Sequence, residues 1–367
     1  MERKRNLNAD LIRCVAVYSV ISVHFLLNSK FYSQPVVGFD MYFMCLMRAC
    51  FMVCVPLFMI LTGYLMWQKK LSKAYYKGIG KTVEIYVLAS IACLLYKEYV
   101  LGYTGVTFVS GIFDILDYDG ANYAWYIEMY FGLFLIIPFL NGAYHSLEGK
   151  RQKQILVWTM IVLTMFPKLV NNFNFTVEGW WLSPSLSKEY QKLIPSFFTG
   201  MYPITYYFLG AYLREYGCSL SRKKNLLLLV FFVWLFGTWN FYRSDGQNFV
   251  WGVNSTWGGE NLITAGLLFV FLLHLHPDRW PGWSRKILVT VSQVSLGIYL
   301  ISWIADQIVY RHFNELVPAV TERWRYYPLI APAVFGLSFL GACILYLLRD
   351  GIHCIVETLS SFRKTAK

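Results

Sequence analysis

The chain has 367 residues, of which 57% are hydrophobic, 19% aromatic and only 15% charged. Soluble globular proteins carry about 25% charged residues, so this composition excludes a water-soluble fold and also the disordered, collagen-like and disulfide-scaffold classes. An integral membrane protein remains. The net charge of +12 would indicate a nucleic-acid partner in a soluble protein. In a membrane protein an excess of basic residues is explained by their concentration in cytoplasmic loops, as described below, so no nucleic-acid partner is expected.

Ten apolar stretches are each close to the length of about 20 residues that a helix needs to cross a bilayer. They predict an all-α polytopic membrane protein that forms a single domain over residues 1–367 and has no separate soluble domain. The expected spans lie near residues 11–29, 41–67, 78–97, 123–141, 155–170, 195–213, 226–241, 260–275, 288–310 and 328–349.

Lysine and arginine are distributed unevenly over the loops that these spans define. With a cytoplasmic N-terminus, the inner segments hold 22 of the 33 basic residues and the outer loops hold 9, while Arg13 and Arg48 fall inside spans. The positive-inside rule therefore predicts that both termini are cytoplasmic. No small-residue cleavage site follows the first apolar stretch, so residues 11–29 are expected to be a retained span.

The eight cysteines lie in spans or inner segments, which argues against an extracytoplasmic disulfide framework. Cys50 and Cys54 are four residues apart, but no second His or Cys pair accompanies them. We interpret them as buried small residues and expect no metal site.

Charged residues inside the bilayer cost at least about 2.5 kcal/mol each at the helix centre, so those that occur are functional candidates. Arg13 and His24 are the most informative pair. Eleven helical residues turn through about 1100° and rise about 16 Å, which places both side chains on one face at different depths. The alternative is structural: Arg13 paired with Asp10, and His24 satisfied by a neighbouring helix.

Four further ionisable residues are expected at the depth of His24, near the outer side. Arg48 lies about 10 Å and Glu128 about 8 Å below the outer boundary, and Glu260 and Asp306 lie near the outer ends of their spans. Carboxylates can orient a histidine and an arginine can stabilise an oxyanion, so Arg48 and Glu128 join His24 as catalytic candidates. Glu260 and Asp306 are candidate substrate-binding residues, with water-exposed interfacial residues as the alternative.

Five segments together resemble the acyltransferase 3 family of membrane acyltransferases. They are Arg13-x10-His24, the Val-Pro-Leu-Phe-Met-Ile-Leu-Thr-Gly-Tyr-Leu stretch at 55–65, Trp-Tyr-Ile at 125–127 with Ile-Pro at 137–138, Tyr-Phe-Leu-Gly-Ala-Tyr-Leu at 207–213, and Ser-Leu-Gly-Ile-Tyr-Leu-Ile at 295–301. The resemblance covers residues 8 to 350 in the expected order.

This resemblance implies ten helices and the transfer of an acyl group, commonly acetyl, from cytoplasmic acetyl-CoA to a hydroxyl of a surface glycan or its lipid-linked precursor. It implies a catalytic role for His24, a role for Arg13 on the acyl-CoA side, and substrate contacts at Trp125 and Tyr126. It also indicates a bacterial plasma membrane. In two places the chain departs from the family pattern: Ser302-Trp303 replaces a frequent histidine, and Thr62 stands at a serine position.

The chemistry is consistent with this resemblance. A sugar hydroxyl is a poor nucleophile, so transfer needs a base such as His24 and a positive group at the developing oxyanion. The histidine either deprotonates the acceptor or carries the acyl group as a covalent intermediate. Acyl-CoA is a polyanion, and four lysines could assist Arg13 in binding it, unless they act only as topology signals: Lys69, Lys70, Lys73 and Lys77.

Aromatic residues on the outer side are suited to stacking on sugars, although an interfacial aromatic belt also explains them. They are Trp180, Trp181, Trp251 and Trp257. The competing function is a transporter or flippase for a glycolipid or small solute. Such proteins often show inverted repeats and broken spans, which this sequence does not display clearly. Membrane lipids are expected partners, and a homo-oligomer is compatible with the sequence.

Overall fold

The computed structural model describes residues 5–365 except 104, 106, 172, 181–190 and 250–256. Within these residues every regular element is a helix and there is no strand, which confirms the predicted all-α class. The elements are α1 (Leu7–Asn28), η1 (Phe31–Ser33), α2 (Gly38–Phe51), α3 (Cys54–Met66), α4 (Lys73–Lys77), α5 (Gly80–Tyr99), α6 (Phe108–Leu116), α7 (Trp125–Ser146), α8 (Gly149–Thr164), α9 (Phe166–Val170), η2 (Phe197–Met201), α10 (Tyr202–Tyr216), α11 (Arg222–Arg243), α12 (Gly259–Leu273), η3 (Pro277–Arg279), α13 (Gly282–Leu316), η4 (Val320–Tyr326) and α14 (Tyr327–Thr365).

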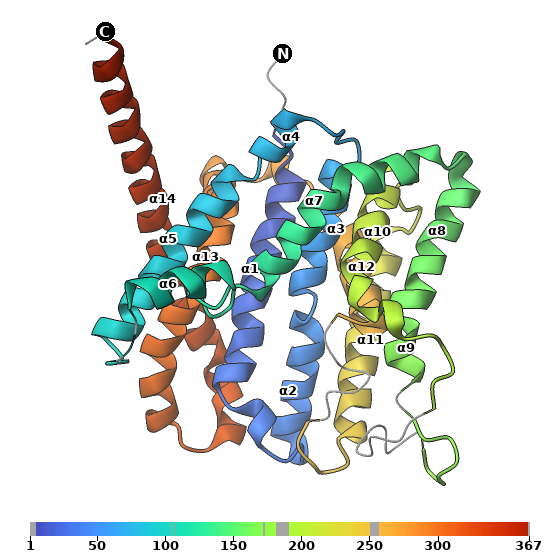
Figure 1. Ribbon diagram of the computed structural model, residues 1–367. Helices are drawn as coiled ribbons and strands as arrows, with labels where there is room; N and C mark the ends of the chain where they lie inside the picture. Colours follow the sequence, from blue (N-terminus) through green and yellow to red (C-terminus); the bar gives the residue numbers. More distant parts are fainter. Residues whose placement is uncertain are drawn as a thin grey trace.

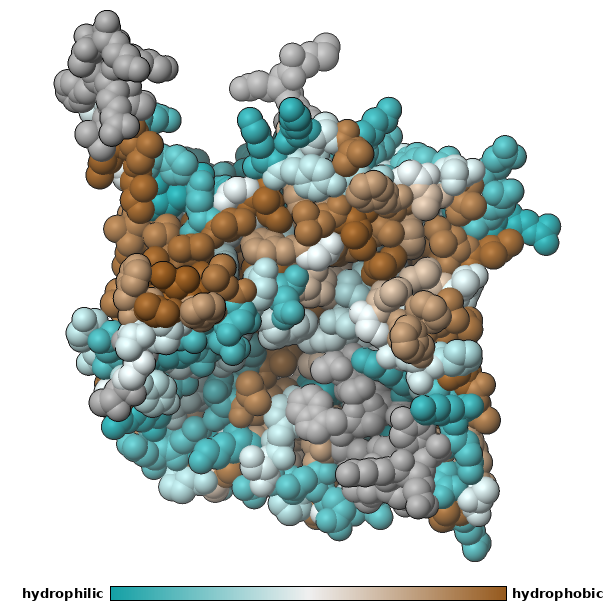
Figure 2. Space-filling model, in the orientation of Figure 1, coloured by the Kyte–Doolittle hydropathy of each residue, from teal (hydrophilic) through white to brown (hydrophobic). Residues whose placement is uncertain are grey.

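Each of the ten expected spans overlaps at least one helix, but some cover two helices and not all of the helices are long. Seven candidate spans in the described part of the chain are long and apolar enough to cross a membrane. The helices α8, α10 and α12 have only 16, 15 and 15 residues. A total of ten spans therefore stays a prediction. Figure 2 shows apolar side chains gathered in a band across the molecule, with hydrophilic residues above and below it.

The first helix and the last helix place the two chain ends at the same end of the bundle (Figure 1). We call this the inner end, because the charge distribution predicts that it is cytoplasmic, and the opposite end the outer end. Helix α1 begins at the inner end, where the side chain of Asn6 accepts a hydrogen bond from the backbone amide of Ala9 and so caps the helix.

The apolar stretch predicted as one span over residues 41–67 is two helices. Helix α2 ends at Phe51 and α3 begins at Cys54. Pro56 explains the break, because a proline has no backbone N–H and its ring clashes with the carbonyl four residues earlier, at Met52. Non-helical backbone at this depth is tolerated where it lines a cavity, and residues on both sides of this break do so.

Helices α3 and α10 pack closely through two glycines. A Cβ atom at Gly63 would collide with the carbonyl oxygen of Tyr207, and one at Gly210 would collide with the carbonyl oxygen of Ile60. Only glycine permits this approach of two helix backbones. The contact fixes α3, which lines both cavities described below.

Helices α1 and α13 run side by side in the same direction through the centre of the bundle (Figure 1). Asp10 contacts Ser292 near the inner end and His24 contacts Asp306 towards the outer end, and in both pairs the partner lies 282 positions further along the chain. The offset between partners stays constant over 14 residues, which is expected when two helices run parallel and rise equally per residue. This pair therefore forms a wall that extends from the inner to the outer half.

Candidate active site

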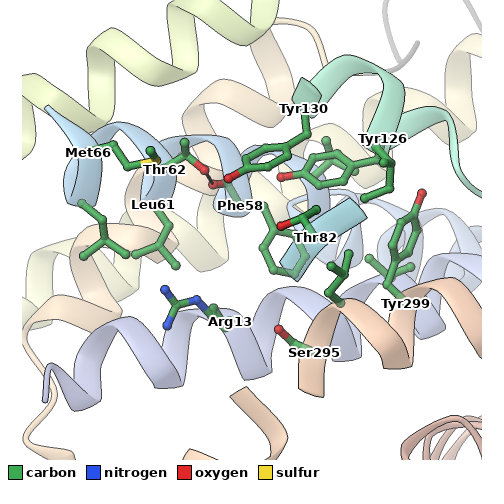
Figure 3. Close-up of a pocket in the computed structure, with 15 residues that line it drawn as sticks. Arg13, Phe58, Leu61, Thr62, Met66, Thr82, Tyr126, Tyr130, Ser295 and Tyr299 are labelled. Carbon is green, nitrogen blue, oxygen red and sulfur yellow. Dashed lines mark hydrogen bonds between the residues drawn. The ribbon is translucent and has the colours of Figure 1, made fainter. Parts of the chain in front are cut away.

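A cavity of about 300 Å³, which we call the inner cavity, lies against the inner half of α1. Figure 3 shows Arg13 and Ser295 on one wall and the rings of Tyr126 and Tyr130 on the opposite wall. Thr62, at the position where the family pattern has serine, also lines it, and its hydroxyl donates to the carbonyl of Phe58 at 2.8 Å. The cavity thus combines one cationic group with mostly apolar and aromatic walls.

Arg13 is held by a buried carboxylate and still reaches the inner cavity. Asp10 accepts hydrogen bonds from Ser292 at 2.6 Å and from Arg5 at 2.7 and 3.0 Å, and it lies 3.3 Å from Nη1 of Arg13. The predicted structural pairing of Arg13 with Asp10 is therefore present. However, one carboxylate serves two arginines, and the Arg13 side chain is 34% exposed. One positive charge at this site has no protein counter-charge in the Arg5–Asp10–Arg13 group.

A more polar space of about 580 Å³ adjoins the inner cavity, with which it shares Leu65. Arg5, Lys69 and Arg214 supply its charges, and the hydrogen bond to Asp10 raises the pKa of Arg5. A second space of about 610 Å³ shares Gln68 and Lys69 with the first and adds Lys70 and His145. We call the two spaces together the basic vestibule. Lys73 and Lys77 line neither space.

A second cavity, of about 390 Å³, lies towards the outer end, and we call it the outer cavity. His24 lines it, and the residues at the break between α2 and α3 form part of its wall. The remaining wall is strongly aromatic. The aromatic residues that line it are Tyr32, Trp125, Tyr202, Trp257 and Tyr299.

His24 lies between this cavity and a buried carboxylate. Its Nδ1 atom is 3.7 Å from Oδ2 of Asp306, a residue that is only 1% exposed. Nδ1 is buried and has no hydrogen-bond partner within the described residues, whereas the side chain as a whole keeps 13% exposure. The Nε2 edge of the ring therefore faces the outer cavity. Asp306 is buried behind the histidine, so the interpretation of Asp306 as a water-exposed interfacial residue is wrong.

Two residues that were not assigned a function from the sequence complete the surroundings of His24. The Tyr123 hydroxyl donates to Oδ2 of Asp306 at 2.9 Å, and its ring lies 4.0 Å from the His24 ring. Asn28 donates to the His24 carbonyl at 2.9 Å and to the Tyr123 hydroxyl at 3.4 Å. Asn28 lies on the same helix face as His24, so its position was visible in the sequence. Tyr123 follows a turn in which Asn122 has a φ of 57°, and no helical period predicts where such a side chain points.

Arg48 and Glu260 belong to a separate buried cluster. The Arg48 Nε donates to the Tyr32 hydroxyl at 3.1 Å, and its guanidinium lies 4.4 Å from the centre of the Phe249 ring. Glu260 faces both Arg48 and Arg243 and is 7% exposed, so it is not an interfacial residue in water. Tyr32 lines the outer cavity whereas Arg48 does not. The structure therefore places Arg48 one side chain away from the outer cavity.

Glu128 is not brought to the site. It is exposed on α7, and its side chain makes no hydrogen bond or ion pair with any described residue. Glu128 lines neither cavity, and it lies about 200° of helix rotation from Tyr126 and from Tyr130, which both line the inner cavity. The depth of Glu128 was inferred from the sequence, but its direction depends on how α7 is rotated in the bundle.

The aromatic candidates separate into two groups. Trp125 and Trp257 stack at 5.6 Å and both line the outer cavity. Trp180 packs against Phe173 and Phe175 instead. Trp181 and Trp251 lie outside the described residues.

The comparison with protein families agrees with this arrangement. Residues 6–347 match the acyltransferase 3 family, which is described as an acyltransferase domain. The chain belongs to this family. Among curated proteins and among solved structures, nothing matches it.

As a member of this family, the chain is a membrane acyltransferase with several membrane-crossing helices. The family's Arg-x10-His spacing places one residue in each cavity. At the position of the frequent second histidine, the Ser302 hydroxyl donates to the Tyr299 carbonyl at 2.7 Å and is fully buried. His24 is therefore the histidine that lines the outer cavity. Separately, the described residues contain no group of three His, Cys, Asp or Glu side chains that could hold a metal ion.

Proposed function

We propose that this protein transfers an acyl group, normally acetyl, from acyl-CoA at the inner end to a hydroxyl of a glycan, a lipid-linked sugar or another cell-envelope acceptor at the outer end. The observation that carries the proposal is the placement of Arg13 and His24 in two adjacent cavities along one helix. The family assignment supplies the reaction class, and the two cavities supply a place for each substrate. We infer a bacterial plasma membrane as the setting, by analogy with the family.

The basic vestibule and the inner cavity are suited to acyl-CoA. The nucleotide end of CoA carries several negative charges, and Arg5, Lys69 and Arg214 surround a polar space large enough for phosphate groups. The narrower inner cavity has the apolar walls that the uncharged pantetheine arm and the acyl group need. Arg13 lines the inner cavity, shares Asp10 with Arg5 of the basic vestibule, and lies about 16 Å along α1 from His24.

The outer cavity is suited to the acceptor. Trp125 and Trp257 present stacked rings at its wall, and Tyr32 and Tyr202 add hydroxyl-bearing rings. Apolar ring faces with a few polar tips are typical of sites that bind sugars or amphipathic ligands. An acceptor hydroxyl in this cavity would meet the exposed Nε2 edge of His24.

His24 performs the proton transfer in the simplest mechanism. Neutral Nε2 accepts the proton of the acceptor hydroxyl while the oxygen attacks the thioester carbonyl. The carbon–sulfur bond then breaks, and the CoA sulfur leaves with the proton that the imidazolium returns. Alternatively, Nε2 attacks the thioester carbonyl and the CoA thiolate leaves. The acceptor oxygen then takes the acyl group as the carbon–nitrogen bond breaks, and the acceptor proton goes to the CoA thiolate. In both routes Asp306 stabilises the positive charge on the ring, and Tyr123 holds Asp306 in place.

A transporter or flippase remains the competing function, and the break at Pro56 is the observation that favours it, because transporters often have broken spans. The acyltransferase family assignment weighs against it.

The test is transfer of radiolabelled acetyl from acetyl-CoA that is supplied to the inner face of sealed vesicles containing native lipids and glycan precursors. The wild type should label an acceptor, and His24→Ala should not. His312→Ala is the matched control, because His312 is an exposed histidine on α13. If folded wild type is as inert as His24→Ala, the acyltransferase proposal fails and a transport assay is the next experiment.

A further inference from the structure

The inner and outer cavities meet at three side chains. Val20, Val55 and Tyr299 line both of them, and these residues are only 4%, 5% and 7% exposed. Figure 3 shows Tyr299 at the opposite end of the inner cavity from Arg13. These three side chains therefore form the boundary between the space that holds Arg13 and the space that holds His24.

The helix periods place this boundary on the direct route between the two functional groups. On α1, Val20 is seven residues after Arg13 and four before His24, so all three share one face. On α13, Tyr299 is seven residues after Ser292 and seven before Asp306. Ser292 binds Asp10 at the inner end, and Asp306 lies behind His24 at the outer end. Tyr299 is thus halfway along the wall, about 10 Å of helix rise from each.

The Tyr299 ring is held in this position by contacts on both sides. Its hydroxyl donates to the backbone carbonyl of Tyr123, the residue whose side chain packs on His24. Its ring meets Tyr126 of the inner cavity edge-on at 6.0 Å. An acyl group that moves from the inner cavity to His24 must therefore displace this ring or fit past it.

We propose that Tyr299, together with Val20 and Val55, determines which acyl groups reach His24, and that it selects short chains. This inference rests on the proposed function, and it adds a residue that sets specificity without taking part in bond making. An acetyl group requires the least displacement of the ring. Each further methylene must be accommodated between one aromatic and two branched side chains. Exclusion of one methylene changes the ratio of kcat/KM for two substrates by about tenfold or more.

The first experiment measures kcat/KM with acetyl-CoA, butyryl-CoA and octanoyl-CoA for wild type and four variants. Tyr299→Ala should raise the butyryl-to-acetyl ratio at least about tenfold, and Val20→Ala should raise it by a smaller factor. Tyr299→Phe keeps the ring and should keep the wild-type ratio. Leu61→Ala is the matched control, because Leu61 is 3% exposed and lines only the inner cavity.

The outcomes separate this proposal from the proposed function. If wild type transfers acetyl and Tyr299→Ala has the same ratio as Leu61→Ala, chain length is selected elsewhere and the proposal is wrong. If folded wild type transfers no acyl group from any of the three donors, the proposed function has failed. The boundary between the two cavities is then tested by a measurement that does not depend on acyl transfer.

Cys54 provides that second measurement, because it lines the outer cavity and is 2% exposed. A charged, membrane-impermeant methanethiosulfonate is added to the inner face of sealed vesicles, and modification of the Cys54 peptide is quantified by mass spectrometry. Tyr299→Ala should increase the modification rate at least tenfold over wild type and over Leu61→Ala. Equal rates in all three proteins would show that Tyr299 is not a barrier and would overturn the proposal.

Discussion

The inner and outer ends of the α1–α13 pair present polar groups in the same register but at very different exposure. At the inner end Asp10 serves two arginines, and the Arg13 side chain is 34% exposed. At the outer end Asp306 faces a single histidine, and the histidine keeps only 13% exposure. One end thus presents a partly exposed excess positive charge, and the other a nearly buried carboxylate–histidine pair.

This difference indicates how one pair of helices can support both donor binding and proton transfer. An arginine side chain attracts a polyanion but stays protonated, so it is a poor base. A histidine can accept and return a proton, and a carboxylate behind it sets its orientation. The two ends are separated by apolar side chains and by Tyr299. Three predictions test whether binding and chemistry are divided in this way, and a fourth tests the packing that holds α3.

The largest effect is expected for His24→Ala, which should lower kcat by about 10³-fold, within the range typical of a lost general base. The dissociation constant for acetyl-CoA should stay within about twofold, because the basic vestibule is unchanged. Transfer assays and equilibrium dialysis with labelled acetyl-CoA measure the two quantities. A parallel loss of acetyl-CoA binding would contradict the division between the two ends.

A smaller loss is expected for Asp306→Asn. The amide keeps the size of the side chain but removes the negative charge behind the ring, so kcat should fall about 10²-fold, as for the loss of a group that orients a functional histidine. Asp278→Asn is the matched control, because the Asp278 side chain is 61% exposed near the inner end. Equal activity of the two variants would remove Asp306 from the mechanism.

Arg13→Ala should act on the donor. Loss of one charge-assisted contact costs about 1.5–3 kcal/mol, which corresponds to an increase of roughly 10- to 100-fold in KM for acetyl-CoA. The change in kcat should be smaller. Arg311→Ala, which removes an exposed arginine on α13, should leave KM unchanged. A kcat effect as large as that of His24→Ala would mean that Arg13 acts at the reaction itself.

The smallest effect on activity is expected in the packing of α3 and α10. Gly63→Ala forces a Cβ against the Tyr207 carbonyl and should lower the free energy of unfolding by about 1–3 kcal/mol. Gly132→Ala is the control, because nothing lies within 4 Å of a Cβ there, and it should be neutral or slightly stabilising. Thermal unfolding in detergent measures both. Equal melting temperatures would show that this contact does not constrain α3.

Some of the site could be predicted because its signal is local. The spacing of Arg13 and His24 fixes their shared face on one helix, whatever else the chain does. Asn28 lies on that same face. Tyr299 lay within a segment that resembles the family, but its halfway position became visible only when α13 was placed beside α1.

Other expectations depended on helix rotation, which hydropathy does not specify. Glu128 was expected at the depth of His24, but it lines neither cavity, whereas Tyr126 two residues earlier on α7 lines the inner cavity. Glu260 and Asp306 were placed near the outer ends of their spans, yet both are buried. Asp306 lies at His24, whereas Glu260 joins Arg48 and Arg243 in another cluster.

The sequence by itself determined the membrane class, the approximate positions of the main apolar helices and the alignment of Arg13 with His24, because these follow from composition and from the helical period. Only the tertiary structure decided that Asp306 stands behind His24, that Pro56 breaks a span beside a cavity, and that Tyr299 separates two cavities. These features depend on the register between helices that are far apart in the chain, and register is set by the packing of many side chains at once.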